Sequence, residues 1–226
     1  MEQYKKDFIE LLVDANALQF GEFTYKSGRV GPYFLNLGKL FDAKHFSRLA
    51  DSYAQAIHAL TKGNVDVVFG PAYKGIPLAV GAATAYMFRY DRNVSYSFNR
   101  KEAKDHGEGG VLVGAPLDDS MIVIVDDVMT AGTAIRETLD MFQEMEIWQE
   151  NVAGVVLGCD RMERGKGDKS AMAEIAEEYG VPVAAIVNLE EIVEHLHGRE
   201  VNGKVVLDDE GVARIQAYRA EFGALS

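Results

Sequence analysis

The chain has 226 residues, of which 48% are hydrophobic, and this is long and apolar enough for a substantial buried core. Its formal net charge is -12, which argues against a broad nucleic-acid or membrane-surface role, because both need an extended basic face. Cys159 is the only cysteine, so an intrachain disulfide framework and a Cys-based zinc site are excluded.

The sequence shows no pattern of a transmembrane helix or of a signal peptide. No apolar span reaches the roughly 18 residues of a transmembrane helix, and the start of the chain, residues 1–7, lacks the apolar segment of a signal peptide. We therefore predict a cytoplasmic protein, in which Cys159 is a small core residue.

The first 41 residues differ in pattern from the rest of the chain. Residues 2–18 carry apolar side chains at helical spacing, which predicts a packing helix. Residues 20–41 alternate aromatic and turn residues, which predicts short strands and a small N-terminal hood. Lys26 and Phe34 in this hood can contact a planar or anionic ligand, although composition alone favours an ordinary β-subdomain with core aromatics.

Strand and helix patterns alternate from residue 43 to residue 188. This alternation predicts an α/β fold with a mostly parallel central sheet flanked by helices, as one domain over residues 1–226. The predicted strands are 65–70, 93–98, 121–125, 152–157 and 181–187, and the predicted helices are 43–62, a segment ending near 90, 135–145, 168–180, 189–196 and 211–222.

The loop Gly70–Pro77 follows a predicted strand and precedes a helix. Ligands of open α/β sheets collect at the carboxyl ends of strands. Backbone N–H groups and Lys74 can therefore hold a diphosphate here. An ordinary tight connection explains the same residues equally well.

A charged segment covers residues 99–110. It has no apolar periodicity, ends in glycines, and carries Arg100, Lys101, Lys104 and His106. We expect an exposed loop. A lid that closes over an anionic transition state would also have such cations and glycine hinges. A solvated surface loop is the usual alternative.

The most informative stretch is Val123–Ala134. An apolar β-branched strand is stopped by Asp126 and Asp127, followed by a small-residue turn and a helix. Free N–H groups and the helix dipole suit a phosphate, and Thr130 and Thr133 can add hydroxyls or cap the helix. The two carboxylates suit sugar hydroxyls or hydrated Mg²⁺. For the Asp pair alone, a polar strand end is the simpler interpretation.

Arg161 follows the next strand and can pair with a carboxylate in bidentate fashion or form a surface ion pair. His195 and His197 do not share a helix face, so we predict no metal site there. The sequences G-x-x-x-x-G-K-[ST] and G-x-G-x-x-G are missing, which weighs against ATP hydrolysis and NAD chemistry.

Together these segments carry a resemblance to a known family. Residues 125–134, Val-Asp-Asp-Val-Met-Thr-Ala-Gly-Thr-Ala, resemble the phosphoribosyl diphosphate signature of type I phosphoribosyltransferases. Residues 69–77 and 99–110 are more specific, and resemble the orotate phosphoribosyltransferase family. Phe-Thr-Tyr-Lys-Ser-Gly-Arg, Pro-Tyr-Phe, Asp160-Arg161 and Glu163-Arg164-Gly165 also fit, and the similarity runs in order from about residue 4 to 196.

The resemblance implies the type I phosphoribosyltransferase fold, with residues 1–41 supplying the N-terminal helix and hood. It implies transfer of a phosphoribosyl group from 5-phosphoribosyl 1-diphosphate to orotate, giving orotidine 5′-monophosphate and diphosphate in pyrimidine (UMP) biosynthesis. Mg²⁺ is the implied cofactor, held through diphosphate, ribose hydroxyls and water rather than by direct protein ligands. The implied assembly is a homodimer whose lid is shared across the interface, with Lys101 reaching the neighbouring site.

The resemblance also implies residue roles. The implied catalytic residues are Lys101, Lys104, His106, Asp126 and Asp127. Phosphoribosyl diphosphate would contact Lys26, Tyr73, Lys74, Arg100, Lys101, Lys104, His106, Asp126, Asp127, Val128, Met129, Thr130, Ala131, Gly132, Thr133 and Ala134. Orotate would contact Lys26, Phe34, Leu35, Thr130 and Arg161.

Some positions depart from the family pattern. Leu35 replaces a second aromatic, residues 144–151 with Trp148 are longer than usual, and residues 197–210 are atypical. Two alternatives stay open. A purine or uracil phosphoribosyltransferase shares residues 125–134, but would not be expected to carry this lid and Arg161. A non-enzymatic phosphoribosyl diphosphate sensor would usually carry a DNA-binding module, and none is recognisable.

Overall fold

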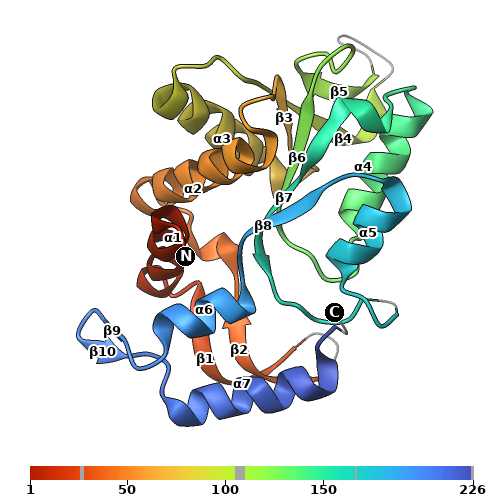
Figure 1. Cartoon of the computed structure of the whole chain (residues 1–226). Helices are drawn as coiled ribbons and strands as arrows, with labels where there is room; N and C mark the ends of the chain where they lie inside the picture. The colour runs from red at the N-terminus through yellow and green to blue at the C-terminus, as the bar shows by residue number, and fades with distance from the viewer. Residues whose placement is uncertain (26–27, 105–109, 166, 225–226) are drawn as a thin grey trace.

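The structure is a computed structural model that describes residues 1–25, 28–104, 110–165 and 167–224, without the side chains of residues 102–104 and 149. Figure 1 shows a sheet between two layers of helices, with α1, α2 and α3 on one side and α4 and α5 on the other. The predicted α/β class, with a mostly parallel sheet flanked by helices, is confirmed.

In the described part of the chain the central sheet has six strands in the order β5-β4-β3-β6-β7-β8. Neighbouring strands are parallel except for the antiparallel pair of β4 and β5. The strands are β3 (Val67–Phe69), β4 (Ser95–Lys104), β5 (Gly110–Gly114), β6 (Ile122–Val128), β7 (Val152–Asp160) and β8 (Val183–Asn188).

Alternating residues of the strands bury their side chains in two separate cores. On β6, Val123 and Val125 pack with α1, α2, α3 and α6, whereas Ile122 and Ile124 pack with α4 and α5. This follows from the two-residue period of a strand, and explains why β6 is apolar from Ile122 to Val125. The helices are α1 (Gln3–Asp14), α2 (Ala43–Thr61), α3 (Gly75–Tyr90), α4 (Thr133–Glu144), α5 (Ala171–Tyr179), α6 (Leu189–Leu196) and α7 (Asp209–Phe222), with 3₁₀ turns η1 (Leu37–Lys39) and η2 (Gln149–Asn151).

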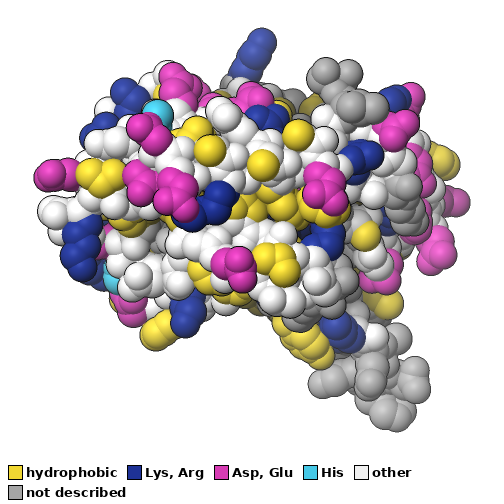
Figure 2. Space-filling view, turned by 90° about the horizontal axis from the view of Figure 1, so that it is seen from below, with side chains coloured by type: hydrophobic (Ala, Val, Ile, Leu, Met, Phe, Trp, Pro, Cys, Tyr) yellow, Lys and Arg dark blue, Asp and Glu magenta, His cyan; other side chains and the backbone are white. Residues whose placement is uncertain are grey.

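The hood is a separate antiparallel pair, β1 (Leu18–Thr24) with β2 (Val30–Leu35). The C-terminal helix α7 lies along it at the bottom of Figure 1. Tyr218 of α7 packs edge-on against Tyr25 and Tyr33 of the hood, with ring centroids 6.2 and 6.3 Å apart. Figure 2 views this side and shows basic and acidic side chains interspersed around exposed apolar ones.

Two strands, β6 and β4, extend beyond the ends that we predict for them at the site. β6 continues through Val128, so Asp126 and Asp127 belong to the strand instead of following it, because β7 keeps pairing with it as far as Val128. β4 continues through Lys104, so residues 99–104 are strand rather than loop, because the unpredicted strand β5 pairs with them. Residues 105–109 lie outside the described chain.

The two atypical segments have simple structures. Residues 197–210 contain a short hairpin of β9 (Glu200–Val201) and β10 (Lys204–Val205). Residues 144–151 include η2, and Trp148 beside it is 57% exposed.

One buried hydrogen bond ties a helix to the end of the central strand. The hydroxyl of Tyr53, on α2, donates to the backbone carbonyl of Asp126 at 2.7 Å, and Tyr53 is fully buried. Burial and the nearby charges of Asp127 and Asp126 raise the pKa of Tyr53 well above its usual value, so this hydroxyl stays protonated.

We expect Tyr53→Phe to lower the free energy of unfolding by about 1–2 kcal/mol, because a buried carbonyl loses a donor without a change in side-chain volume. Urea denaturation measures this loss. Tyr179→Phe is the control, since its hydroxyl bonds to Asp140 at an exposed position, and it should change stability by less than about 0.5 kcal/mol. Equal losses in the two variants would contradict the anchoring role of Tyr53.

Candidate active site

The sheet changes direction between β3 and β6. From β3 the chain continues to its neighbour β4 on one side, and β6 then lies on the other side of β3. In open parallel sheets a crevice forms at such a switch point, outside the carboxyl ends of the strands. The two loops that leave this crevice start at Gly70 and Met129, and these are the two segments that the sequence singled out.

An ion pair joins the two loops across the crevice. Lys74 Nζ, after β3, donates to Asp127 Oδ2, at the end of β6, at 2.5 Å. The Asp127 side chain is 11% exposed and that of Lys74 is 69% exposed. The hydrogen bond to Asp127 raises the pKa of Lys74, so the ammonium stays charged. The Ala72–Tyr73 peptide bond in the same loop is cis.

Asp126 carries the second carboxylate. Its Oδ1 accepts from the backbone N–H of Asp127 at 2.9 Å. Burial, followed by the neighbouring charge of Asp127, raises the pKa of Asp126 to about 6 from its usual 3.8. Asp126 therefore keeps its proton to a higher pH than an ordinary aspartate, and among the described residues only Asp127 has a direct cationic partner.

The turn between β6 and α4 forms an open cavity of about 270 Å³. Gly132 caps α4 with φ +72°, and a Cβ there would lie 2.5 Å from Ile175 Cδ1, so both backbone and space require glycine. Within the described chain no side chain caps α4, so Thr130 and Thr133 do not act as caps. The first N–H groups of this helix are therefore available to an anion. The cavity is lined by Asp126 and by Val128, Met129, Thr130, Ala131, Gly132, Thr133, Ala134 and Ile135.

The predicted lid begins next to the loop after β3. Lys101 Nζ lies 4.9 Å from the ring centroid of Tyr73, a cation–π contact. Asn99 Oδ1 accepts from the backbone N–H of Ala72 at 2.8 Å, which fixes β4 to that loop. Arg100 is half-buried beside them. The side chain of Lys104, together with His106, lies outside the described residues.

Most of the residues assigned to the base come from the hood and from the loop after β7. Arg161 Nη2 donates to Thr130 Oγ1 at 3.2 Å, so Arg161 reaches the turn between β6 and α4. Phe34 is 38% exposed and stacks on Phe23, with centroids 5.6 Å apart. Leu35 is half-buried and packs against the larger core. Lys26 lies outside the described residues.

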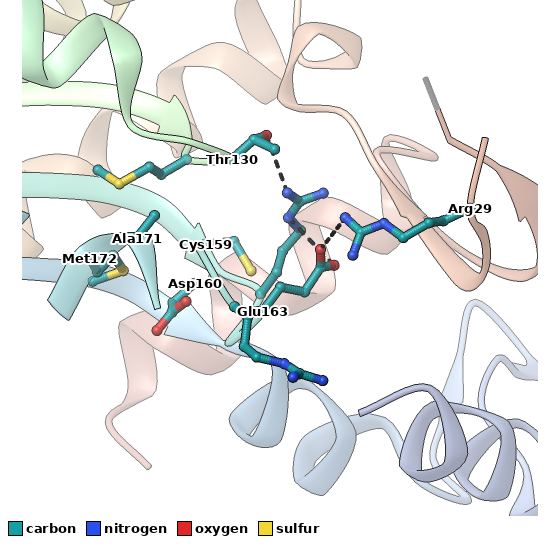
Figure 3. A pocket seen from close by; sticks show the side chains of 10 residues that line it. Arg29, Thr130, Cys159, Asp160, Glu163, Ala171 and Met172 are labelled. Carbon is teal, nitrogen blue, oxygen red and sulfur yellow. Dashed lines mark hydrogen bonds and ion pairs between the residues drawn. The ribbon is translucent and has the colours of Figure 1, made fainter. Parts of the chain in front are cut away.

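Sequence reasoning assigned no role to Arg29 or Glu163. Both line the same small pocket as Arg161 and Thr130 (Figure 3). Glu163 follows Arg161 by two residues, and this acidic residue beside a candidate ligand-binding arginine was the available signal. Its other partners come from the hood, far away in the sequence, so no local pattern indicated them.

Among the described residues, no group of three His, Cys, Asp or Glu side chains is placed to hold a metal ion. His195 instead bonds to Glu10, with 3.1 Å between Nε2 and Oε1. Within the same residues, no helix has the length and apolar character needed to cross a membrane.

Comparison with known proteins gives the family. The model of the phosphoribosyl transferase domain matches residues 36–183. The orotate phosphoribosyltransferase of Lachnoclostridium phytofermentans is 48% identical over 224 residues, with 99% of both chains covered. That of Clostridium acetobutylicum is 46% identical with the same coverage. The crystal structure of orotate phosphoribosyltransferase from Francisella tularensis has a TM-score of 0.80 and 38% identity, over 96% of this chain and 100% of that one. The chain therefore belongs to the orotate phosphoribosyltransferase family of phosphoribosyltransferases.

Proposed function

We propose that this protein transfers the phosphoribosyl group of 5-phosphoribosyl 1-diphosphate to orotate, releasing diphosphate and forming orotidine 5′-monophosphate for pyrimidine biosynthesis. The observation that carries the proposal is the Lys74–Asp127 pair across the switch point, beside an uncapped helix N-terminus. This arrangement places a cation, a carboxylate and free backbone N–H groups at one crevice. Relatives named for this reaction cover the chain over nearly its whole length.

The ribose phosphate would bind at the end of β6. The N–H groups and hydroxyls of residues 130–134 suit the 5′-phosphate, since they line one open cavity at the start of α4. Asp126 and Asp127 suit the ribose hydroxyls, because ionised carboxylates accept hydrogen bonds from two hydroxyl groups at once. Val128 and Met129 complete the wall of this subsite.

The diphosphate would bind between the loop after β3 and the lid. Tyr73 and Lys74 come from the loop, and Arg100 and Lys101 come from β4. Within one chain Lys101 lies against Tyr73, and in the proposed dimer the Lys101 of the neighbouring chain would reach this end of the crevice. The proposed contribution of Lys26, Lys104 and His106 to the same subsite involves side chains outside the described residues.

Orotate would bind between the hood and the loop after β7. Arg161 suits its carboxylate, because a guanidinium pairs with a carboxylate in bidentate fashion. Phe34 offers an exposed ring for the flat base, and Thr130 links this subsite to the phosphate turn through Arg161. Leu35 would contribute only from the rim, since it packs against the core.

Mg²⁺ is the proposed cofactor. The described residues offer oxygen donors, the preferred Mg²⁺ ligands, at Asp126 and Asp127, but Lys74 already occupies one of them. This donor set fits an ion bound mainly through substrate oxygens and water. When bound, the ion would neutralise and orient the diphosphate.

The chain's own residues then act on the bond between the ribose C1 and the diphosphate, which breaks early. Orotate is a weak nucleophile, so the ribose C1 acquires oxocarbenium character while negative charge builds on the departing diphosphate. Lys101 and Arg100 stabilise that charge more in the transition state than in the ground state. Closure of the lid would exclude water that hydrolyses the donor.

The direct test is to follow orotate absorbance after mixing the protein with orotate, phosphoribosyl diphosphate and Mg²⁺. We expect absorbance to fall, and we expect uracil or adenine in place of orotate to give no nucleotide. Asp127→Ala is the inactive control, because it removes the carboxylate at the centre of the crevice. Stable orotate absorbance with folded wild-type protein would refute the proposed reaction.

We further propose that the protein is a homodimer. An open groove of about 1010 Å³ lies between α2 and α3, where Phe88 is 87% exposed. An apolar groove of this kind on a surface marks an interaction site. Its walls also include Phe46, Ile76 and Val80, and a second copy of this face would cover them.

The shared lid can be tested by mixing two inactive variants. Lys101→Ala should lose roughly 10²- to 10³-fold in turnover, like the loss of one transition-state donor. If Lys101 acts on the neighbouring site, refolded mixtures with Asp127→Ala should recover about a quarter of wild-type activity, since half the dimers have one complete site. Mixed dimers isolated by two different tags, but without activity, would show that each lid serves its own chain.

We expect Asp126 to be needed for turnover but to lower the free energy of unfolding at neutral pH. A carboxyl whose pKa rises from 3.8 to about 6 on folding favours the fold below pH 3.8, and this contribution is lost as pH rises through 6. At pH 7.5 the free energy of unfolding of Asp126→Asn should therefore exceed that of wild type by about 1–3 kcal/mol, so the variant should unfold at a higher temperature. Its turnover should fall. Thermal unfolding at pH 4.5 is the control. There Asp126 is mostly protonated in the folded protein, so most of the difference should vanish; a constant difference would contradict the shifted pKa.

A further inference from the structure

Glu163 is a carboxylate with no role in the proposed chemistry. It follows β7 on the same loop as Arg161, and its side chain is only 9% exposed. Figure 3 shows its carboxylate beside the guanidinium of Arg29, in the pocket that Thr130 also lines. An anionic group this deeply buried needs an explanation, because removing a carboxylate from water is unfavourable unless its partners compensate.

Three groups from different parts of the chain surround this carboxylate. The Tyr33 hydroxyl donates to Oε1 at 3.0 Å, and Arg29 Nη2 donates to Oε2 at 3.2 Å. Arg161 Nε lies 3.8 Å from Oε1. Burial and the charge of Glu163 raise the pKa of Tyr33, which therefore remains a donor. Glu163 thus connects two hood residues, Arg29 and Tyr33, to Arg161 of the proposed base subsite.

Arg161 is held at both ends of its guanidinium group. Nη2 donates to Thr130 at 3.2 Å, and Nε faces Glu163. That Nε is buried, and among the described residues it has no hydrogen-bond partner. The ion pair with Glu163, 3.8 Å away, is therefore the contact that restrains this edge of the guanidinium. A planar group fixed in this way can present its remaining N–H donors in one orientation.

The charges of the cluster decide what a substitution should do. Arg29 and Arg161 carry two positive charges and Glu163 one negative charge, so the cluster has a net charge of about +1. Neutralising Glu163 would raise this charge. Simple attraction of an anionic base would then become stronger. Loss of orientation would have the opposite effect, and the two explanations predict changes of opposite sign.

The far side of this loop is supported by α7. The backbone N–H of Arg164 donates to the carbonyl of Phe222 at 3.0 Å, and that of Ala224 donates to Met162 at 2.9 Å. Arg29 lies over the Phe222 ring, 5.0 Å from its centroid. The backbone around Glu163 is therefore held independently of its side chain, which allows the side chain to be changed without releasing the loop.

From these contacts we propose that Glu163 is a positioning residue of the base subsite, which orients Arg161 toward the carboxylate of orotate and couples that arginine to the hood. The inference rests on the proposed function, since it takes orotate as the ligand of Arg161. It adds a specificity-determining residue that does not itself touch the substrate. Its effect should therefore appear in orotate binding and not in binding of the phosphoribosyl donor.

The test is steady-state kinetics of Glu163→Gln. Gln keeps an acceptor for Tyr33, but its amide nitrogen cannot accept from an arginine. We expect the KM for orotate to rise about ten-fold or more, because Gln removes the negative charge that faces Arg161 Nε and so breaks a shielded ion pair. The KM for phosphoribosyl diphosphate should stay within about two-fold. Glu163→Asp, which keeps the charge on a shorter stem, should give an intermediate KM for orotate.

Glu174→Gln is the matched control. Glu174 is also a shielded, arginine-paired carboxylate, with a side chain 17% exposed and Arg136 Nη2 at 3.4 Å. Because this pair lies on α4 and α5 rather than in the base subsite, neither KM should change by more than about two-fold. Thermal unfolding of all variants reports any general loss of structure.

The remaining outcomes separate the possible failures. An orotate KM that is unchanged or lower in Glu163→Gln would overturn the proposal in favour of simple charge attraction. Equal changes in both KM values with a lower Tm would overturn it in favour of a purely structural role. Wild-type protein that does not consume orotate would refute the proposed function itself, and that result is obtained before any variant is compared.

Discussion

The ion pair between Lys74 and Asp127 is the constraint on which the site depends. It joins the two loops that diverge from the switch point, and it does so with a carboxylate that is almost completely shielded by the fold. A shielded carboxylate needs a partner, and Lys74 supplies one while keeping most of its own side chain exposed. Asp127 therefore holds the lysine in place while most of its side chain stays exposed to solvent.

The neighbouring Asp126 carboxylate is held in the site without a direct cationic partner among the described residues. Two carboxylates stand side by side at the end of β6, and in the described part of the chain only one has a direct cation. The other is held by backbone hydrogen bonding, with α2 fixing its peptide group through Tyr53. Active sites commonly sacrifice stability for function, and α2 packs against this part of the sheet.

Much of this arrangement could be predicted from residue patterns. The apolar run before Asp126, the small-residue turn and the helix after it are local features, so their fold and position followed from spacing. The extension of β4 could not be predicted, because it depends on pairing between Asn99 and Leu112 across a segment without apolar alternation. The environment of Glu163 was missed for a similar reason, since Tyr33 lies 130 residues earlier.

The position of α7 has a consequence for how the protein is made. The hood and the loop after β7 both rest against this helix, although α7 is synthesised after every strand of the central sheet. A nascent chain can therefore assemble the sheet and the turn between β6 and α4 before α7 emerges, given that folding proceeds as the chain emerges. The hood and the loop after β7, where we propose that orotate binds, gain this support only when α7 is complete.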